Sequence, residues 1–167
     1  FRWRHRFRPR REQLDRIKTL AELKPLLENP HIGKIGQHLK YDTHVLANHG
    51  IDLQGIVFDT MLASYVLDAT ATRHNMDDLA KHYLNYQTTT FEELAGKGVK
   101  QLCFDEIDIE AASHYACEDA DITLRLKEVF MPMLLAQPAL HHLFHDFVLP
   151  FASILQQMEA RVILFVF

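Results

Sequence analysis

The stretch AASHYACEDADIT, residues 111–123, places a phenol and a carboxylate at helical spacing. Tyr115 and Asp119 are four residues apart, so a helix with about 3.6 residues per turn brings them onto one face. Alanines at the same spacing would let another element pack closely on an adjacent face. A phenol and a carboxylate one turn apart can hold a divalent ion and orient a water. Because helices often carry this pair with no chemistry attached, the pair alone does not establish a function.

The length and composition predict one domain. At 167 residues, 48% of them hydrophobic, the chain can bury one sizeable core. Its two cysteines, Cys103 and Cys117, follow no CxxC pattern, and no signal peptide is recognised, so we expect a reducing, cytoplasmic location. No apolar run is long enough for a membrane span.

The basic residues are concentrated at the N-terminus. Residues 1–11, FRWRHRFRPRR, hold six of the 18 Lys and Arg residues and no acid, which leaves 12 basic against 22 acidic residues in 12–167. This net negative charge in residues 12–167 disfavours binding along the phosphate backbone of nucleic acid, unless bound metal ions reverse the charge locally. The basic segment could be an arm that stacks on bases. We favour a disordered tail or residues foreign to the domain, because nothing behind it shares its pattern.

Strands alternate with helices along the chain, which indicates an α/β fold with an incomplete sheet. Thr19 and Glu22 fit a capping box for the first helix, whose leucines are expected to face a core. Asp59 is expected to cap a later helix, and Pro132 to limit the helix that carries Tyr115. The predicted strands span 34–37 and 55–58, the predicted helices 20–28, 39 to before Gly50, 60–67, 77–85, 109–130 and 139–160, and a polar connection 86–104.

Three segments outside the 111–123 stretch could carry chemistry. In GQHLKYD, residues 36–42, Asp42 projects from the start of a helix after a strand, where active-site groups of α/β folds commonly lie; it could equally be an acid favoured by the helix dipole. Arg73 could hold a phosphate, or be a solvated loop charge. Phe91, in a Thr-rich loop, is either a stacking platform or an anchor for that loop.

Other patterns are weaker. Lys97 lies between two glycines and could contact a phosphate or form a turn, but the spacing is not that of a P-loop. His141 and His145 share a helix face and could bind zinc, although no third and fourth ligand follow at useful spacing. A structural or zinc-binding helical protein is therefore a minor alternative. No local Ser-His-Asp or Cys-His signature occurs.

Five blocks occur in an ordered series: KIGQHLKYDTHVLANHGI, FDTMLASYVLD, RHNMDDLAKHYL, TTTFEELAGKG and YACEDADITL. Together they resemble the 3′–5′ exonuclease (proofreading) domain of bacterial DNA polymerase I, the tyrosine subtype of the DEDD exonucleases. The resemblance covers about Thr19 to Arg161 and implies a ribonuclease-H-like α/β fold, incomplete at its N-terminus. It divides the chain into a non-matching basic tail (1–18), a partial exonuclease domain (19–137), a helix leading toward a polymerase domain (138–161) and a non-matching apolar end (162–167).

The resemblance implies a mechanism and a set of site residues. Two divalent cations, Mg²⁺ or Mn²⁺, clamp the scissile phosphate of a single-stranded DNA 3′ end. Asp42 matches the acid of the second exonuclease motif and Asp119 that of the third, so both are expected to bind metal and act in catalysis. Tyr115 matches the tyrosine that orients the attacking water. Four residues fall on positions near the bound strand: His38, Lys40, Arg73 and Phe91. The polymerase domain of the same longer chain is the other implied partner.

The chain also departs from the family pattern. The first motif of the family is a DxE pair on the opening strand, whereas the only DIE here, residues 108–110, begins the Tyr115 helix. His38 stands where the family usually has asparagine, and an imidazole does not imitate an amide. Because only two of the family's four metal-binding acids are recognised, we expect weak Mg²⁺ binding and little cleavage. The missing strand and the non-matching ends suggest that the sequence is an incomplete reading of a longer polymerase gene. The alternative is a non-catalytic module that binds single strands or scaffolds a polymerase domain.

Overall fold

The structure is a computed structural model that describes residues 14–163, apart from the side chains of Lys100 and of residues 160–163. The basic N-terminal segment, interpreted above as a tail rather than a base-stacking arm, and the last four residues lie outside this part of the chain. The helices are α1 (Arg16–Leu27), α2 (Leu39–Ala47), α3 (Thr60–Leu67), α4 (Met76–Leu84), α5 (Phe91–Ala95), α6 (Ile109–Leu135), α7 (Pro138–His142) and α8 (Leu149–Ile163). Shorter helical segments are η1 (Gly98–Lys100), η2 (Phe104–Glu106) and the π-helical η3 (Leu143–Val148); the strands are β1 (Lys34–Gly36) and β2 (Ile56–Asp59).

The two strands form a small parallel sheet. Ile35 lies opposite Phe58 and Gly36 opposite Asp59. Parallel strands need a crossover connection, which α2 provides here. The described residues contain no third strand, and helices make up most of them. This confirms the predicted α/β class, in which helices dominate and the sheet is incomplete.

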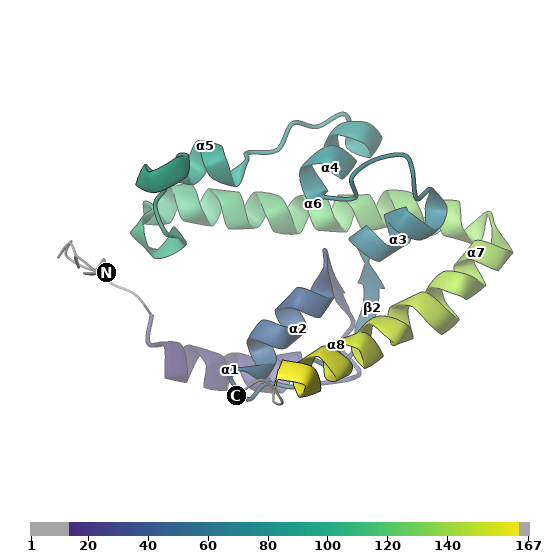
Figure 1. Ribbon diagram of the computed structural model, residues 1–167, viewed down its shortest axis with the longest axis horizontal. Helices are drawn as coiled ribbons and strands as arrows, with labels where there is room; N and C mark the ends of the chain where they lie inside the picture. The colour runs from purple at the N-terminus through teal and green to yellow at the C-terminus, as the bar shows by residue number, and fades with distance from the viewer. Residues whose placement is uncertain (1–13, 164–167) are drawn as a thin grey trace.

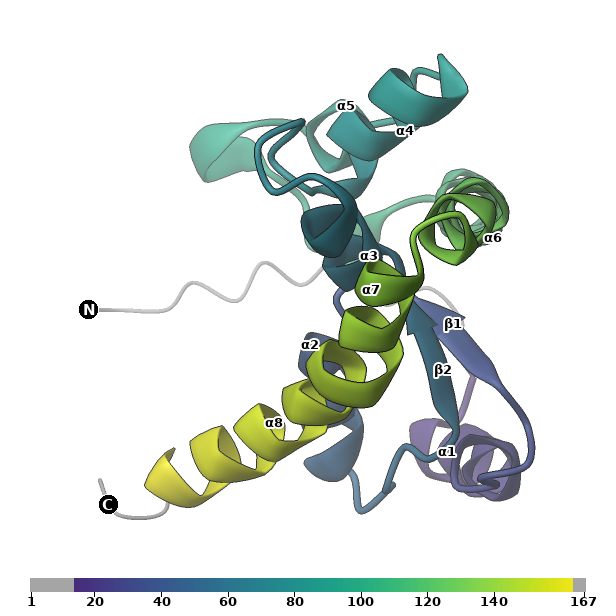
Figure 2. The ribbon, with the colours of Figure 1, turned by 90° about the vertical axis from the view of Figure 1, so that its right-hand side faces the viewer.

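The long helix α6 organises the packing. Figures 1 and 2 show α4 and α5 on one side of α6, and α1, α2 and α8 on the other. Ile122, Leu126, Phe130 and Leu134 recur every four residues along α6, and each is at most 1% exposed. Burying such a side chain stabilises a fold by roughly 1.5–3 kcal/mol. This stripe joins the core formed with residues of β2, α3, α4 and η3: Phe58, Ala63, Leu79, Ala80 and Phe144.

The first helix differs from its prediction. It begins at Arg16 with Asp15 as its cap, and the Asp15 side chain accepts the Lys18 N–H at 2.9 Å. The predicted Thr19 capping box is therefore wrong, because an aspartate four residues earlier caps the helix by accepting the Lys18 N–H. The leucines expected in a core are also not buried: Leu23 is 42% exposed and Leu26 47%. Within the described chain, α1 lies at the edge of the fold and has only weak contacts with other elements.

Three further boundaries differ from the sequence analysis. Helix α6 continues through Pro132 to Leu135, and the extra turn is anchored by the buried Leu134. The connection 86–104 contains the short helix α5, which the Thr90–Glu93 capping box opens. The last predicted helix is divided by η3, where the Leu149 N–H reaches the Phe144 carbonyl five residues back. No helix in 14–163 is both long and apolar enough to cross a membrane.

Candidate active site

The turn between β1 and α2 places Asp42. A side chain at Gly36 would collide with Leu39, which is buried at the start of α2. His38 then turns the chain with φ 61° and ψ 44°, a left-handed conformation that is uncommon for a residue with a side chain. Helix α2 begins directly after it, so Asp42 lies in the first turn of the helix, as predicted.

Asp59, at the end of β2, fixes this turn. Asp59 is 2% exposed, and its carboxylate accepts four backbone N–H groups. Two belong to the start of α3, from Met61 at 2.9 Å and Leu62 at 3.1 Å. The other two belong to the start of α2, from His38 at 3.2 Å and Leu39 at 2.7 Å. The predicted cap of α3 is confirmed, and the same side chain also caps the helix that carries Asp42.

Asp42 and Asp119 line one pocket of about 490 Å³. The pocket lies between the end of β1, the start of α2, the start of α4 and the middle of α6. Two carboxylates distant along the chain are thereby brought to one site by the β1–α2 turn and by α6. Its remaining lining residues are Ile35, Gly36, Gln37, Met76, Ala120, Thr123 and Leu124.

The electrostatics of this pocket disfavour two free carboxylates. Burial and the nearby charges of Asp77 and Glu118 raise the pKa of Asp119 to about 6. Loss of solvent raises the pKa of Asp42 as well; His38 opposes this rise and Asp59 adds to it. Both acids therefore sit where added positive charge is favourable.

The donors at the pocket are oxygens, the ligand type that Mg²⁺ and Mn²⁺ prefer. Among residues 14–163, however, no group of three or more His, Cys, Asp or Glu side chains is close enough to hold a metal ion. The pocket therefore offers two protein carboxylates at most from its lining, and water or phosphate oxygens would have to complete a coordination shell.

Tyr115 lies one helical turn before Asp119 and is surrounded by aromatic rings. Its ring centroid is 6.4 Å from that of Phe91 and 6.3 Å from that of Phe104. Burial raises the pKa of the Tyr115 phenol, and the charges of Asp119 and Asp77 add to the rise. The hydroxyl consequently stays protonated at neutral pH and can donate a hydrogen bond.

The Thr-rich segment before Phe91 is fastened to two helices. Glu118 of α6 accepts the Tyr86 hydroxyl and the Thr89 N–H, each at 2.8 Å. Asp77 of α4 accepts the hydroxyl of the buried Thr88 at 2.6 Å. Phe91 follows as the first residue of α5 and is 38% exposed.

Sequence reasoning missed Asp77, Phe104 and Glu118 as site residues. Asp77 and Glu118 lie inside two of the motif blocks quoted above, RHNMDDLAKHYL and YACEDADITL. Their place in these blocks was the signal that could have identified them. Phe104 lies in the polar connection and gave no local signal.

Arg73 lies away from the pocket that holds Asp42 and Asp119. Its guanidinium binds Asp78 through two hydrogen bonds, Nε–Oδ2 at 2.6 Å and Nη2–Oδ1 at 3.1 Å. The Arg73 side chain is 81% exposed and lines a separate pocket beside α4. The predicted phosphate contact therefore has to compete with an ion pair in this arrangement.

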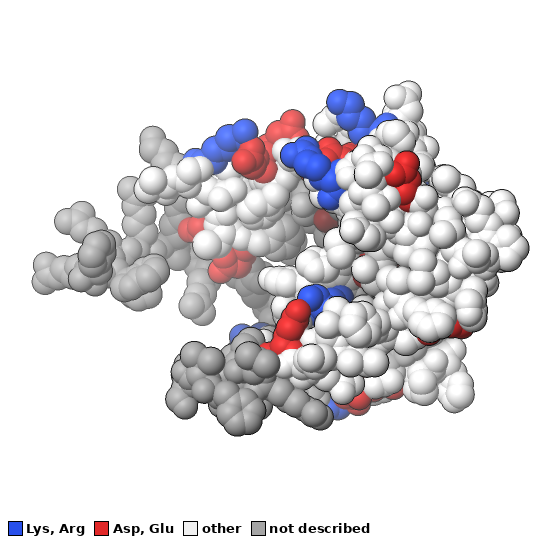
Figure 3. Space-filling view, turned by 45° about the vertical axis from the view of Figure 1, so that its right-hand side comes forward, with Lys and Arg blue, Asp and Glu red and all other residues white. Residues whose placement is uncertain are grey.

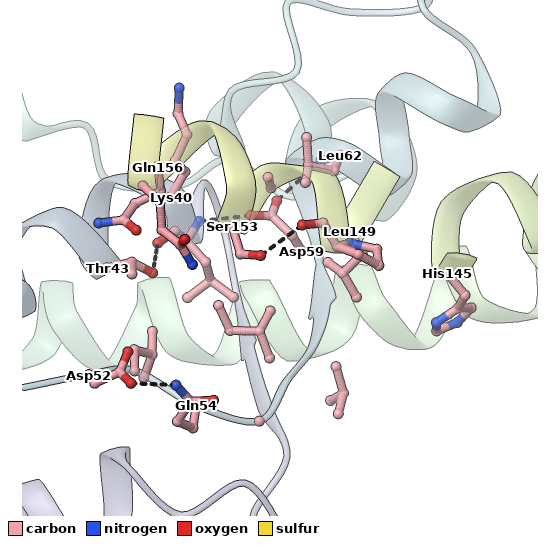
Figure 4. A pocket seen from close by; sticks show the side chains of 18 residues that line it. Lys40, Thr43, Asp52, Gln54, Asp59, Leu62, His145, Leu149, Ser153 and Gln156 are labelled. Atoms are coloured by element: carbon pink, nitrogen blue, oxygen red, sulfur yellow. Dashed lines mark hydrogen bonds between the residues drawn. The ribbon is translucent and has the colours of Figure 1, made fainter. Parts of the chain in front are cut away.

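Lys40 lies on the other side of α2. Its ammonium pairs with Glu159 of α8 at 2.7 Å, and His44 contacts the same carboxylate at 3.1 Å. Lys40 lines a pocket of about 510 Å³ between α2, β2 and α8, which Figure 4 shows from close by. His38 is exposed at the β1–α2 turn, with its ring centroid 6.2 Å from that of Tyr41.

The pocket in Figure 4 offers few free polar groups. The Asp59 oxygens are occupied by backbone N–H groups, the Gln54 amide donates to Asp52 at 2.6 Å, and the Thr43 hydroxyl donates to the Leu39 carbonyl at 2.8 Å. Ser153 donates to the Pro150 carbonyl at 2.7 Å. Its hydrogen-bonding groups thus stabilise the junction of α2, β2 and α8.

The histidines at α7 and η3 do not form a larger ligand set. The rings of His141 and His145 lie 4.6 Å apart, and burial lowers the pKa of His145. His142 is bound to Asp146 instead. In the described part of the chain no third ligand joins the pair, so the geometry does not favour a zinc site.

On the face drawn in Figure 3, acidic and basic side chains are interspersed and form no continuous basic band.

Comparisons with a family model and with known proteins both find 3′–5′ exonuclease and DNA polymerase I sequences. Residues 10–135 match the family model described as 3′–5′ exonuclease. The chain is 54% identical over 150 residues to DNA polymerase I of Pseudomonas aeruginosa, covering 89% of this chain and 16% of that protein. It is 41% identical over 149 residues to DNA polymerase I of Rhizobium leguminosarum, covering 89% of this chain and 14% of that protein.

The fold also resembles part of a solved DNA polymerase structure. The polymerase domain of Pol1 from M. smegmatis, in complex with DNA primer-template and dNTP, superposes with a TM-score of 0.61 at 25% identity. The match covers 85% of this chain and 21% of that one. The chain thus spans only a small part of the length of the proteins that it matches.

Proposed function

Since the chain belongs to the family of 3′–5′ exonuclease domains found in DNA polymerase I, we propose that it provides part of a site that removes nucleotides from DNA 3′ ends by hydrolysing phosphodiester bonds. One observation carries this proposal. Asp42 of α2 and Asp119 of α6 line the same pocket, and Tyr115 lies one turn from Asp119. Removal of mismatched 3′ ends during replication and repair is the corresponding cellular role.

Asp42 and Asp119 would hold a divalent cation, Mg²⁺ or Mn²⁺, through their carboxylate oxygens. Bound there, the metal would polarise the scissile phosphate and lower the pKa of a bound water. Ionised Asp119 is the form that binds a cation, and its pKa of about 6 allows this form at neutral pH. The protonated Tyr115 phenol would orient the attacking water by hydrogen bonding.

Substrate positioning would come from the residues around the pocket. Phe91 is 38% exposed and would stack on a base near the 3′ end. His38 is exposed at the β1–α2 turn, next to the helix that carries Asp42. Arg73 and Lys40 would contribute phosphate contacts only after releasing Asp78 and Glu159.

We expect little hydrolysis by the 167-residue chain alone. Two carboxylates line the pocket, and Mg²⁺ sites that transfer phosphoryl groups need further oxygen ligands. The DxE pair that the family places on a strand is not found before Thr19 in this sequence. In this proposal residues 19–137 form the exonuclease part, and 138–161 lead toward a polymerase domain of a longer chain.

A non-catalytic role is the second candidate. It is favoured by the absence, within the described residues, of a third metal-ligating side chain near Asp42 and Asp119. The chain would then bind a single-stranded end or scaffold a polymerase domain without cleaving DNA.

A cleavage assay separates the two candidates. A 5′-labelled single-stranded DNA is incubated with the chain in Mg²⁺ or Mn²⁺, and shortening from the 3′ end is followed on a gel. Slow shortening that Asp119→Ala abolishes supports the exonuclease. Glu128→Ala, at an exposed position of the same helix, is the matched control and should change nothing. Binding without any shortening, in the native chain as well as in Asp119→Ala, supports the non-catalytic module.

A further inference from the structure

We propose that Phe104 is a second nucleobase-stacking residue of this site, acting beside Phe91 at the Tyr115 ring. The inference rests on the proposed function, because it assigns a binding role within the same site. It goes beyond the family resemblance, which gave no role to the segment that carries Phe104.

The three rings form one aromatic cluster centred on Tyr115. Phe91 contacts Tyr115 with the two ring planes at 65°, and Phe104 contacts it with the planes at 58°. Tyr115 is half-buried, whereas Phe91 is 38% and Phe104 47% exposed. Two open rings against one half-buried ring offer an apolar surface for a flat ligand. Single exposed phenylalanines are common on proteins, but two of them meet here at the tyrosine next to Asp119.

Phe104 is held in its exposed position by its neighbours. The Leu102 N–H donates to the Ala95 carbonyl at 2.8 Å and ties the segment to the end of α5. The Glu106 carboxylate accepts the Cys103 N–H at 3.0 Å and closes the η2 turn. Ile107, which follows, is only 6% exposed. The backbone that presents Phe104 is therefore anchored at both ends, so the ring is pre-positioned for a ligand.

The charges around both phenylalanines select which part of a nucleotide can bind there. Asp105 and Glu106 follow Phe104, and Glu92 and Glu93 follow Phe91; all four are exposed. Lys97, which follows α5, is paired with Glu92. Carboxylates repel phosphate, whereas an uncharged base can stack on a ring next to them. An unpaired nucleobase thus fits this surface, and the sugar–phosphate backbone does not.

A binding experiment with two oligonucleotides tests the assignment. The full chain is titrated with fluorescein-labelled single-stranded DNA in Ca²⁺, and anisotropy is followed. One oligonucleotide ends in a 3′ adenine and the other in a 3′ abasic site. If Phe104 stacks on the base, the native chain prefers the adenine end, and Phe104→Ala reduces that preference by about fivefold or more, the lower range for base–aromatic stacking.

The controls use other aromatic positions. Phe151→Ala removes a 54% exposed phenylalanine on α8, outside the cluster, and should leave the preference unchanged. Phe104→Trp should keep or increase the preference, because the larger ring still stacks. Should Phe104→Ala fail to fold, as judged by circular dichroism, Phe104→Leu takes its place, since leucine fills the space without a π-face.

Each outcome decides a different point. If the unaltered chain binds neither oligonucleotide, the proposed function is overturned, and this inference with it. If the unaltered chain prefers the adenine end and Phe104→Ala or Phe104→Leu keeps that preference in full, only the role of Phe104 is overturned. A preference lost in Phe104→Ala and kept in Phe104→Trp supports it.

Discussion

The carboxylate of Asp59 accepts the backbone N–H of Leu39 at 2.7 Å, so a residue at the end of β2 caps the helix that carries Asp42. The same carboxylate caps α3. One buried side chain therefore sets the position of α2 relative to the sheet, and with it the place of Asp42 at the pocket.

We expect Asp59→Ala to lower the free energy of unfolding by about 2–4 kcal/mol, because it removes two helix caps worth roughly 0.5–2 kcal/mol each and leaves buried N–H groups unpaired. Urea unfolding followed by circular dichroism measures the change. Asn75→Ala is the matched control, since Asn75 caps only α4 through a 2.8 Å bond from the Asp78 N–H. A loss no larger than that of Asn75→Ala would show that the contact with α2 contributes little.

The pKa of Asp119 predicts how stability depends on pH in the absence of metal. The folded-state pKa of about 6 lies above the ordinary value of 3.8, so the folded chain binds this proton more tightly than the unfolded chain. Unfolding free energy should therefore decrease as the pH rises from about 4 to 6 and then level off. After a discount for solvent screening of a half-buried group, the decrease attributable to Asp119 is about 1 kcal/mol.

Asp119→Asn should remove this dependence, because the amide does not titrate. In EDTA at pH 7.5 the variant is expected to be more stable than the native chain by about 1 kcal/mol, and near pH 4 the difference should vanish. Urea midpoints across this pH range measure both. A variant that is less stable at pH 7.5 would contradict the assigned pKa.

Glu118 should control the mobility of the segment before Phe91. Glu118→Ala removes the acceptor for the Thr89 N–H and the Tyr86 hydroxyl, so hydrogen exchange at Thr89 is expected to become at least about tenfold faster. Mass spectrometry of peptides covering residues 86–91 measures the rate. Glu128→Ala, exposed on the same helix, should leave exchange unchanged. Equal protection in Glu118→Ala would mean that Asp77 and Thr88 alone hold the segment.

Local signals in the sequence predicted the elements that depend on neighbouring residues. Asp59 before an apolar helical run predicted the cap and start of α3. The first helix was misplaced because two capping residues compete, and Asp15 starts the helix before Thr19 can. The π-helical η3 could not be read from the pattern, since it lies inside a continuous helical run.

The candidate site depended on two kinds of information. The spacing of Tyr115 and Asp119 indicated a shared helix face, and this followed from periodicity alone. The association of Asp42 with them came from the family resemblance, because no local pattern encodes a contact between distant segments. Glu118 and Asp77 were missed for the same reason: their partners, Thr89 and Thr88, become neighbours only in the folded chain.

The pocket formed by Asp42 and Asp119 predicts weak metal binding that needs both residues. With two carboxylates, we expect Mn²⁺ to bind with a Kd of about 1 mM or weaker, as measured by the loss of the free-ion electron paramagnetic resonance signal. Asp42→Ala and Asp119→Ala should each remove most of this binding. If both carboxylates hold one ion, the double variant should lose no more than either single variant, because the interaction is already absent. Asp121→Ala, exposed on α6, should retain the native affinity. Losses that simply add would show that the two carboxylates bind separate ions.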